Sequence, residues 1–377
     1  MQSFIVRRII QRLSVGSNFR HKTVDTSSGI YIYGAGELGT LAIEYCEACG
    51  IKILGVLDQK KCGIVSGIVS DYLVCKPEDI SVEMRAKAPV AVAVATLPYM
   101  PILKTLQSKG WENVLPFYSM TANPQVGHPL KNGWLVGQCS RQELEMVEAI
   151  CARWADLTSL EHYEAFLAWH IDGTELTLIG QGVEPNKRYA IPPLLAAFSK
   201  RFGQMVDVGS HQGESIKRLL DEGITFSEYI LFEPDGASLN QLKKNVDRYL
   251  PGHKHIKFFD HVLGNDNDLR AFQEGLGYCS QLWSESLSLK SVMPLDSMEC
   301  SPDLLKIHTE GTELEVLLGA IGTIDRCKPI IAFSIYHNRD GFCKAIYESM
   351  QRINDYVWYF RLHSYQGTGA FVYGIPR

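Results

Sequence analysis

The hydrophobic pattern in the first third of the chain alternates between short apolar runs and longer segments with helical spacing. The apolar runs, each of which predicts a buried strand, are IYIY (30–33), KILGVLD (52–58), PVAVAVAT (89–96) and ENVLPF (112–117). The stretches LAIEYCEACG (41–50) and PILKTLQSKG (101–110) lie between them and end at glycine, as helices commonly do. Strands that alternate with helices predict a parallel α/β sheet, which we place in residues 1–124.

The next part of the chain, residues 125–199, has a different pattern. Its two longest periodic stretches, 142–157 and 159–170, carry apolar residues at helical spacing. We therefore interpret this part as a helical connecting segment. The basic, amphipathic sequence MQSFIVRRIIQRL (1–13) also predicts a helix. Its apolar stretches are too short for the core of a secretory signal, which favours a docked or frayed terminal helix over a targeting peptide or a surface anchor.

Strand and helix patterns alternate again in the last part of the chain. The predicted strands are QMVDV (204–208), EYILFEPD (228–235), a strand with its loop in IKFFDHVLGND (256–266), DLLKIHTEG (303–311) and KPIIAFSIYH (328–337). The predicted helices include SLNQLKKNVDRYL (238–250) and TELEVLLGAIGTI (312–324), and a closing hairpin is predicted at 356–376. The fold class is therefore α/β: two tandem doubly wound sheets, in residues 1–124 and 200–377, joined by the helical segment.

Composition and charge exclude several functional classes. The chain has 377 residues and a net charge of −5, and neither half is strongly basic, so we expect no nucleic-acid partner. No apolar run approaches the ~20 residues needed to span a bilayer, so we expect no membrane span. The ten cysteines are scattered, and the one CxxC pair, Cys46 and Cys49, falls in a predicted helix. We interpret them as reduced thiols of a cytoplasmic protein.

The first glycine-rich turn, GAGELG (34–39), lies between a predicted strand and a helix. It fits GxGxxG with Gly34, Gly36 and Gly39, and Asp58 ends the following strand. Glycines allow close backbone approach to a phosphate at a helix N-terminus, and such an aspartate can accept ribose hydroxyl hydrogen bonds. This predicts a Rossmann-like domain that binds a nucleotide or nucleotide sugar, or one in which the turn is only structural.

The second glycine-rich turn has a different spacing, DxGxxxG, with Asp207, Gly209 and Gly213. Glu233 ends the next predicted strand. This arrangement suits S-adenosylmethionine (SAM): the turn approaches the methionine part, Asp207 holds its ammonium directly or through water, and Glu233 accepts both ribose hydroxyls. Further residues expected at the cofactor lie in the same loops: Ser210, Pro234, His261 and Val262.

Four blocks of the last part of the chain resemble the FkbM-type methyltransferases. They are VDVGSHQGES (206–215), LFEPD (231–235), LLKIHTEGTELEVLLGA (304–320) and KPIIAFSIYH (328–337), in this order. The resemblance covers residues 200–377 and implies a class I SAM enzyme of a family in which many members methylate sugar hydroxyls. The N-terminal domain also resembles the Rossmann-like units that precede some of these enzymes. One block departs from the family pattern, since His308 replaces the usual Asp and Thr312 the usual Ala.

The acceptor side of the site should lie at the same strand ends. Methyl transfer needs an aligned nucleophile and a group that removes its proton. His337 and His308, which follow the last two parallel strands, are the candidate bases, and Glu310 is a third catalytic candidate. Lys306 is expected to pair with Glu310 or Glu313. His308 and Glu310 are also weak candidates for a divalent metal site, with Asp303 or Asp296 nearby, although no dense carboxylate cluster supports one.

The function that these observations favour is SAM-dependent O-methylation of a sugar, nucleotide sugar or glycoconjugate. The expected partner is therefore a small-molecule or glycan acceptor, and a homo-oligomer is compatible with the sequence. Two alternatives stay open. One is a NAD-dependent sugar oxidoreductase or epimerase that uses the N-terminal domain, and the other is a non-catalytic nucleotide-sugar binding protein.

Overall fold

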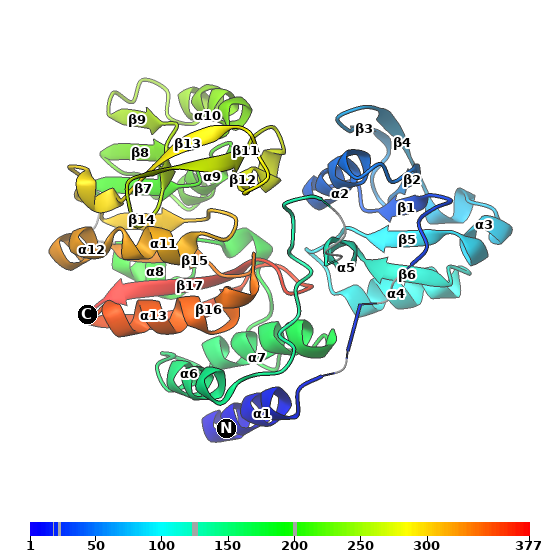
Figure 1. Cartoon of the computed structure of the whole chain (residues 1–377), viewed down its shortest axis with the longest axis horizontal. Helices are drawn as coiled ribbons and strands as arrows, with labels where there is room; N and C mark the ends of the chain where they lie inside the picture. Colours follow the sequence, from blue (N-terminus) through cyan, green and yellow to red (C-terminus); the bar gives the residue numbers. More distant parts are fainter. Residues whose placement is uncertain (18, 22–23, 123–126, 199–201) are drawn as a thin grey trace.

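Two α/β units make up the computed structural model of the protein (Figure 1). The structure describes residues 1–17, 19–21, 24–122, 127–198 and 202–377. Within these residues the strands form one large sheet in each unit and one small sheet that belongs to the C-terminal unit. The predicted fold class, two tandem α/β sheets, is confirmed.

The N-terminal sheet has the strand order β3-β4-β2-β1-β5-β6 in the described part of the chain. All its pairs are parallel except β3 with β4. Its strands are β1 (Ile30–Tyr33), β2 (Ile53–Leu57), β3 (Gly63–Ser66), β4 (Asp71–Cys75), β5 (Pro89–Val92) and β6 (Asn113–Pro116). Its helices are α2 (Glu37–Ala48), α3 (Val82–Lys87), α4 (Tyr99–Ser108) and α5 (Phe117–Thr121).

The C-terminal sheet has the order β16-β17-β15-β14-β7-β8-β9 among the described strands. The strands are β7 (Gln204–Val208), β8 (Glu228–Phe232), β9 (Ile256–Phe259), β14 (Leu304–Ile307), β15 (Ile330–Ser334), β16 (Tyr356–Leu362) and β17 (Ala370–Pro376). β17 runs antiparallel to both of its neighbours, which confirms the predicted closing hairpin. β14 is the middle strand, and the order of the strands reverses between it and its neighbour β7, so a crevice is expected beyond the carboxyl ends of these two strands.

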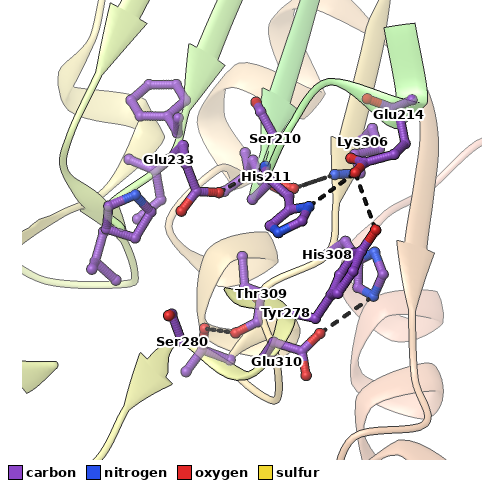
Figure 2. Close-up of a pocket in the computed structure, with 18 of the residues that line it drawn as sticks. Ser210, His211, Glu214, Glu233, Tyr278, Ser280, Lys306, His308, Thr309 and Glu310 are labelled. Carbon is purple, nitrogen blue, oxygen red and sulfur yellow. Dashed lines mark hydrogen bonds and ion pairs between the residues drawn. The ribbon is translucent and has the colours of Figure 1, made fainter. Parts of the chain in front are cut away.

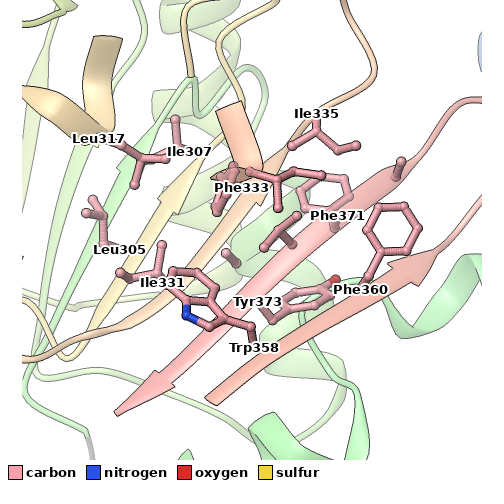
Figure 3. Packing of buried hydrophobic residues seen from close by; sticks show 14 of the residues in the cluster. Leu305, Ile307, Leu317, Ile331, Phe333, Ile335, Trp358, Phe360, Phe371 and Tyr373 are labelled. Carbon is pink, nitrogen blue, oxygen red and sulfur yellow. The ribbon is translucent and has the colours of Figure 1, made fainter. Parts of the chain in front are cut away.

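Helices cover both faces of this sheet. They are α8 (Pro192–Phe198), α9 (Glu214–Asp221), α10 (Gly236–Tyr249), α11 (Glu313–Leu318), α12 (Ile321–Cys327) and α13 (Lys344–Arg352). The central strands are mostly apolar and are buried along their length, as is typical of parallel strands covered on both faces. Figure 3 shows part of the resulting core, where Leu305, Phe333 and Phe371 of neighbouring strands pack together.

The predicted helix over 312–324 is divided into α11 and α12. The break lies at Gly319, where an added Cβ would lie 1.9 Å from the carbonyl oxygen of Gly264. Gly264 directly follows a strand of a small sheet that the sequence pattern did not predict. The small sheet comprises β10 (Val262–Leu263), β11 (Asp268–Gln273), β12 (Gln281–Leu282) and β13 (Leu289–Met293). Its two-residue strands are too short to leave a period-two pattern.

The helices of the predicted connecting segment pack on the C-terminal sheet. α6 (Arg141–Cys151) and α7 (Leu157–Asp172) share their buried residues with the core of that sheet. α1 (Gln2–Val15) lies against both helices, and Figure 1 shows it beside them, away from the N-terminal sheet. The predicted docked terminal helix is thus present, but it belongs to the C-terminal core and not to the domain predicted for residues 1–124. Its apolar stripe, Ile5, Ile9 and Leu13, is buried there.

Replacing Ile9 with valine tests this docking. Ile9 is 2% exposed, so loss of one methylene should lower the free energy of unfolding by about 0.5–1.5 kcal/mol. Urea denaturation followed by tryptophan fluorescence measures the change. The control is Phe4→Leu on the outer face of the same helix, where the side chain is 60% exposed. Equal effects of the two substitutions would show that α1 is not docked in solution.

The two units contact each other at the turn between β16 and β17. The backbone N–H of Tyr365 donates to the carbonyl of Ala95 (2.7 Å), and Gln366 Nε2 donates to the carbonyl of Val94 (2.7 Å). These bonds hold the carboxyl end of β5 beside the C-terminal unit. None of the helices in the described residues is long and apolar enough to cross a membrane.

Candidate active site

A pocket lies at the carboxyl ends of β7, β8 and β14, where the strand order predicts a crevice (Figure 2). Most of the predicted cofactor residues line it: Gly209, Ser210, Glu233, Pro234, His261 and Val262. Two of the predicted catalytic residues, His308 and Glu310, line it as well. In Figure 2, Glu233 lies on the side away from His308, and Ser210 and His211 lie between them.

The second glycine-rich turn packs tightly against the end of β14. Gly209 has a φ of +72°, and a Cβ added there would lie 1.9 Å from the carbonyl oxygen of His308. The backbone N–H groups of Gly209 and Ser210 both donate to the carbonyl of Phe232, at 3.0 and 2.9 Å. Gly213, with a φ of +91°, caps the start of α9 and lies outside the pocket lining. Only glycine satisfies both the conformation and the space at position 209.

Asp207 lies behind the pocket wall and has no exposed surface. Its Oδ1 lies 2.7 Å from Lys306 Nζ, and Ser215 Oγ donates to its Oδ2. Lys306 also donates to the carbonyl of Gly209 (2.6 Å). Burial lowers the pKa of Lys306, but Asp207 beside it outweighs this, and the net shift is upward. The structure thus shows Asp207 fixing the turn through Lys306. The predicted contact with the cofactor's ammonium, directly or through water, stays a prediction.

This pair also corrects the prediction for Lys306. The sequence suggested Glu310 or Glu313 as its partner because they follow in the same block. Lys306 is directly opposite Asp207 in the parallel register of β14 with β7, and that neighbour takes the ammonium. Glu313 instead accepts from the backbone N–H groups of Thr309 (3.2 Å) and Gly311 (3.1 Å).

Glu233 presents a buried carboxylate at the other end of the pocket. Its Oε2 accepts from the backbone N–H of His211 (2.7 Å) and its Oε1 from that of Asp235 (2.9 Å). Burial raises the pKa of Glu233 to about 7, despite these hydrogen bonds. Each oxygen retains a lone pair for a further donor, so this carboxylate can bind a vicinal diol.

Other polar residues that line the pocket were not among the site residues predicted from the sequence. His211 stacks on Tyr278 (ring centroids 4.0 Å apart), and both contact Glu214 Oε1, at 3.0 and 3.2 Å. Arg188 and Glu37 also line the pocket. Glu37 comes from the GAGELG turn of the N-terminal unit, and sequence spacing carries no signal that brings it to this site.

The acceptor side is a compact group of ionisable side chains after β14 and β15. His337 lies between two carboxylates, with Nδ1 2.6 Å from Glu313 Oε1 and Nε2 3.1 Å from Glu310 Oε1. His308 Nε2 lies 3.6 Å from the same Glu310 oxygen and 3.0 Å from the hydroxyl of Tyr336. Glu310 has a φ of +55° in the turn before α11, and its carboxylate lies between the two imidazoles.

The pKa values of the two histidines are shifted in opposite directions. Burial lowers the pKa of His337, but Glu310 and Glu313 outweigh it, and the pKa rises to about 10. Burial, followed by the nearby His337, holds the pKa of His308 well below its usual value. His337 is therefore protonated at neutral pH when no other cation is present, and it is not among the pocket-lining residues. This corrects its predicted role as the base, whereas His308 is neutral and faces the pocket.

The predicted carboxylate partners for a metal at His308 lie elsewhere. Asp303 accepts from the backbone N–H of Gly203 (2.6 Å). Asp296 accepts from those of Gly322 (2.8 Å) and Thr323 (2.7 Å) and caps α12. Both carboxylates thus accept hydrogen bonds from backbone groups, and neither residue lines the pocket.

The first glycine-rich turn uses its aspartate internally. Asp58 accepts from the backbone N–H groups of Ala35 (2.9 Å), Lys60 (2.8 Å) and Lys61 (2.9 Å). Gly34 and Gly39 are in close contact, because a Cβ on Gly39 would lie 1.9 Å from the Gly34 carbonyl oxygen. Gly36 is the N-cap of α2. These contacts account for the motif structurally, and nucleotide binding by Gly34, Gly36, Gly39 and Asp58 stays a prediction.

Comparisons with known proteins agree with this description. The C-terminal unit has a seven-stranded sheet with a glycine-rich turn after β7. Residues 207–366 match the family model of the methyltransferase FkbM domain. The resemblance inferred from the sequence is thereby confirmed for residues 207–366, the FkbM methyltransferase domain of this chain. No curated protein matches the chain.

Solved structures extend the likeness of the fold to the whole chain. The structure of methyltransferase FkbM from Methylobacillus flagellatus KT matches with a TM-score of 0.62 and 18% identity, over 98% of this chain and 93% of that one. An rRNA methylase from Streptococcus thermophilus matches with a TM-score of 0.32 and 13% identity, over 49% of this chain and 96% of that one. The two-unit architecture is thus shared with the Methylobacillus protein.

Proposed function

We propose that the protein is a SAM-dependent O-methyltransferase whose acceptor is a hydroxyl of a sugar, nucleotide sugar or glycoconjugate. The observation that carries the proposal is the pocket of the FkbM methyltransferase domain. A buried carboxylate for a diol lies at one end of this pocket, and a cluster of histidine and carboxylate groups lies at the other. The acceptor is proposed from the family resemblance and from the polar character of the second end.

The residues at the first end fit SAM. Glu233 would accept the ribose hydroxyls, and His261 and Val262, which follow β9, would border the adenine. The turn of Gly209 and Ser210 would face the methionine part, beside Glu214 and Arg188. Bound SAM supplies an activated sulfonium methyl group. The protein then needs only to orient the acceptor oxygen and provide for the loss of its proton.

The residues at the second end fit a polar acceptor. His308 and Glu310 lie within the lining, and the aromatic ring of Tyr278 also faces the pocket. A hydroxyl that binds between His308 and Glu310 meets a neutral imidazole and a carboxylate, both of which accept hydrogen bonds. Tyr278 offers an apolar face of the kind on which sugar rings stack. This is the end at which the acceptor hydroxyl would lose its proton.

Two measurements test the proposal. Titration with S-adenosylhomocysteine (SAH), the demethylated product, should show one site per chain by calorimetry. Methyl-labelled SAM incubated with the protein and a panel of nucleotide sugars should then give a labelled sugar, identified by mass spectrometry. Absence of SAH binding at submillimolar concentration would refute methyl transfer, and label found only on nitrogen would refute O-methylation.

The raised pKa of Glu233 predicts a pH-dependent affinity for SAH. Ribose hydroxyls donate to the ionised carboxylate, so binding requires loss of the proton that Glu233 carries below pH about 7. Affinity should fall as the pH drops from 8 to 5.5, by up to about tenfold per pH unit below the pKa. The matched control is Glu233→Gln, which should bind more weakly at pH 8 but show a flatter profile. His211 and His261 are present in both proteins, so parallel profiles would assign the effect to those groups and contradict the role of Glu233.

A further inference from the structure

We propose that His308, Glu310 and His337 together form a binding site for a divalent transition metal at the acceptor end of the pocket. Among the described residues these three form a group in which one nitrogen of each histidine and one carboxylate oxygen lie within 4.8 Å of one another. Two imidazoles and one carboxylate are a common ligand set for such ions. The site includes His308, one of the two positions at which the sequence analysis finds a departure from the FkbM pattern.

The distances match coordination by a single ion. Ligands about 2.1 Å from a metal are about 3.0–3.4 Å from each other in octahedral or tetrahedral geometry. Glu310 Oε1 lies 3.1 Å from His337 Nε2 and 3.6 Å from His308 Nε2. The rings of the two histidines are nearly parallel, with centroids 5.0 Å apart and an interplanar angle of 23°. The three ligand atoms lie within 4.8 Å of one another, so binding one ion requires side-chain rotations that bring them closer together.

His337 is oriented as a metal-binding histidine would be. Its Nδ1 is 2.6 Å from Glu313 Oε1, a carboxylate that is itself held by Ser334 Oγ (2.8 Å) and two backbone N–H groups. A carboxylate behind Nδ1 fixes the ring and leaves Nε2 to bind the metal. Nε2 is buried and makes no hydrogen bond, although Glu310 Oε1 lies nearby. A buried ring nitrogen that has an ion-pair contact with Glu310 but no hydrogen bond thus points into the proposed site.

The ligand types select the kind of metal. Imidazole nitrogens favour zinc and other divalent transition metals, whereas magnesium and calcium prefer sites made of oxygen atoms. At His308, a metal would use the Nε2 lone pair in place of the contact with the Tyr336 hydroxyl. Because His308 and Glu310 line the pocket, a further coordination position can face it and bind the acceptor oxygen. This role, unlike the metal binding itself, rests on the proposed function.

Metal loading of the full-length protein tests the site. The protein is stripped with a chelator and then titrated with Co²⁺ or Zn²⁺ alone. We expect one ion per chain, visible d–d absorption for Co²⁺, and a higher melting temperature with Zn²⁺. His308→Gln and Glu310→Gln should each weaken binding at least tenfold. His255→Ala removes an exposed histidine outside the site and should bind as the wild type does.

Each outcome decides between the proposal and its competitor. The competing hypothesis is that His337 Nε2 carries a proton and pairs with Glu310. In that case the protein binds no stoichiometric ion. Binding that His308→Gln and Glu310→Gln leave unchanged, in variants with wild-type circular dichroism, would also overturn the proposal. SAH titration of the same samples separates the two hypotheses. Metal binding without SAH binding would refute the proposed function alone, and the reverse would refute the metal site alone.

Discussion

Replacing Lys306 with methionine is expected to lower the free energy of unfolding by about 3–5 kcal/mol, because it leaves a buried carboxylate without a counter-charge. Lys306 and Asp207 are 3% and 0% exposed, and their charged atoms lie 2.7 Å apart. Ser215 donates to Asp207 but carries no charge. Urea denaturation followed by circular dichroism measures the loss. The affinity for SAH should fall too, since Lys306 Nζ also holds the Gly209 carbonyl.

The double variant Asp207→Asn with Lys306→Met is the control. It removes both charges, and the replacement of a buried ion pair by neutral side chains is often close to neutral for stability. Most of the stability lost in the single variant should therefore return. If the single and double variants were equally unstable, packing and not the unpaired charge would be the cause. Asp207→Asn alone should also be destabilising, because it leaves the ammonium unpaired.

The sequence predicted the cofactor side well because its signals are local. A strand, a glycine-rich turn and a helix follow one another in the chain, and the carboxyl ends of parallel strands meet at one edge. Gly209, Ser210 and Glu233 could therefore be placed together from the sequence alone, and His261 with Val262 followed from the next strand. The same logic placed His308 and Glu310 at the pocket.

The roles of individual charges depend on contacts that no local pattern contains. The partner of Lys306 is set by the register of β14 with β7, residues that lie far apart in the chain. His337 is protonated because Glu310, in a left-handed conformation, lies next to it. The sequence TEGTE does not predict that conformation. Glu37 reaches the pocket only because the two units are docked.

The sequence pattern also could not assign every helix to the correct domain. The helical periodicity of α6, α7 and α1 was visible, and all of them are helices. Periodicity reveals that a helix has an apolar face but not which sheet will cover it. The N-terminal helix therefore could not be assigned to the C-terminal core from its sequence, although its stripe of Ile5, Ile9 and Leu13 is buried there.

Gly209→Ala is expected to have the other large effect. An alanine at φ +72° costs about 1–2 kcal/mol in backbone conformation. The added Cβ would lie 1.9 Å from the His308 carbonyl oxygen, and forcing an extra group into a packed region costs about 1–3 kcal/mol more. The turn must then move away from β14, which displaces the wall that faces the cofactor. We expect the free energy of unfolding to fall by about 2–5 kcal/mol and SAH affinity by about 10²-fold.

Gly223→Ala separates the two contributions. Gly223 has nearly the same φ, +74°, but an added Cβ would meet nothing within 4 Å. This variant should lose only the conformational part, about 1–2 kcal/mol, and bind SAH as the wild type does. The comparison by urea denaturation and calorimetry therefore isolates the contact between the turn and β14. Equal stability losses and equal SAH affinities in the two variants would mean that Gly209 is needed for its conformation alone, and that the turn does not depend on its close approach to His308.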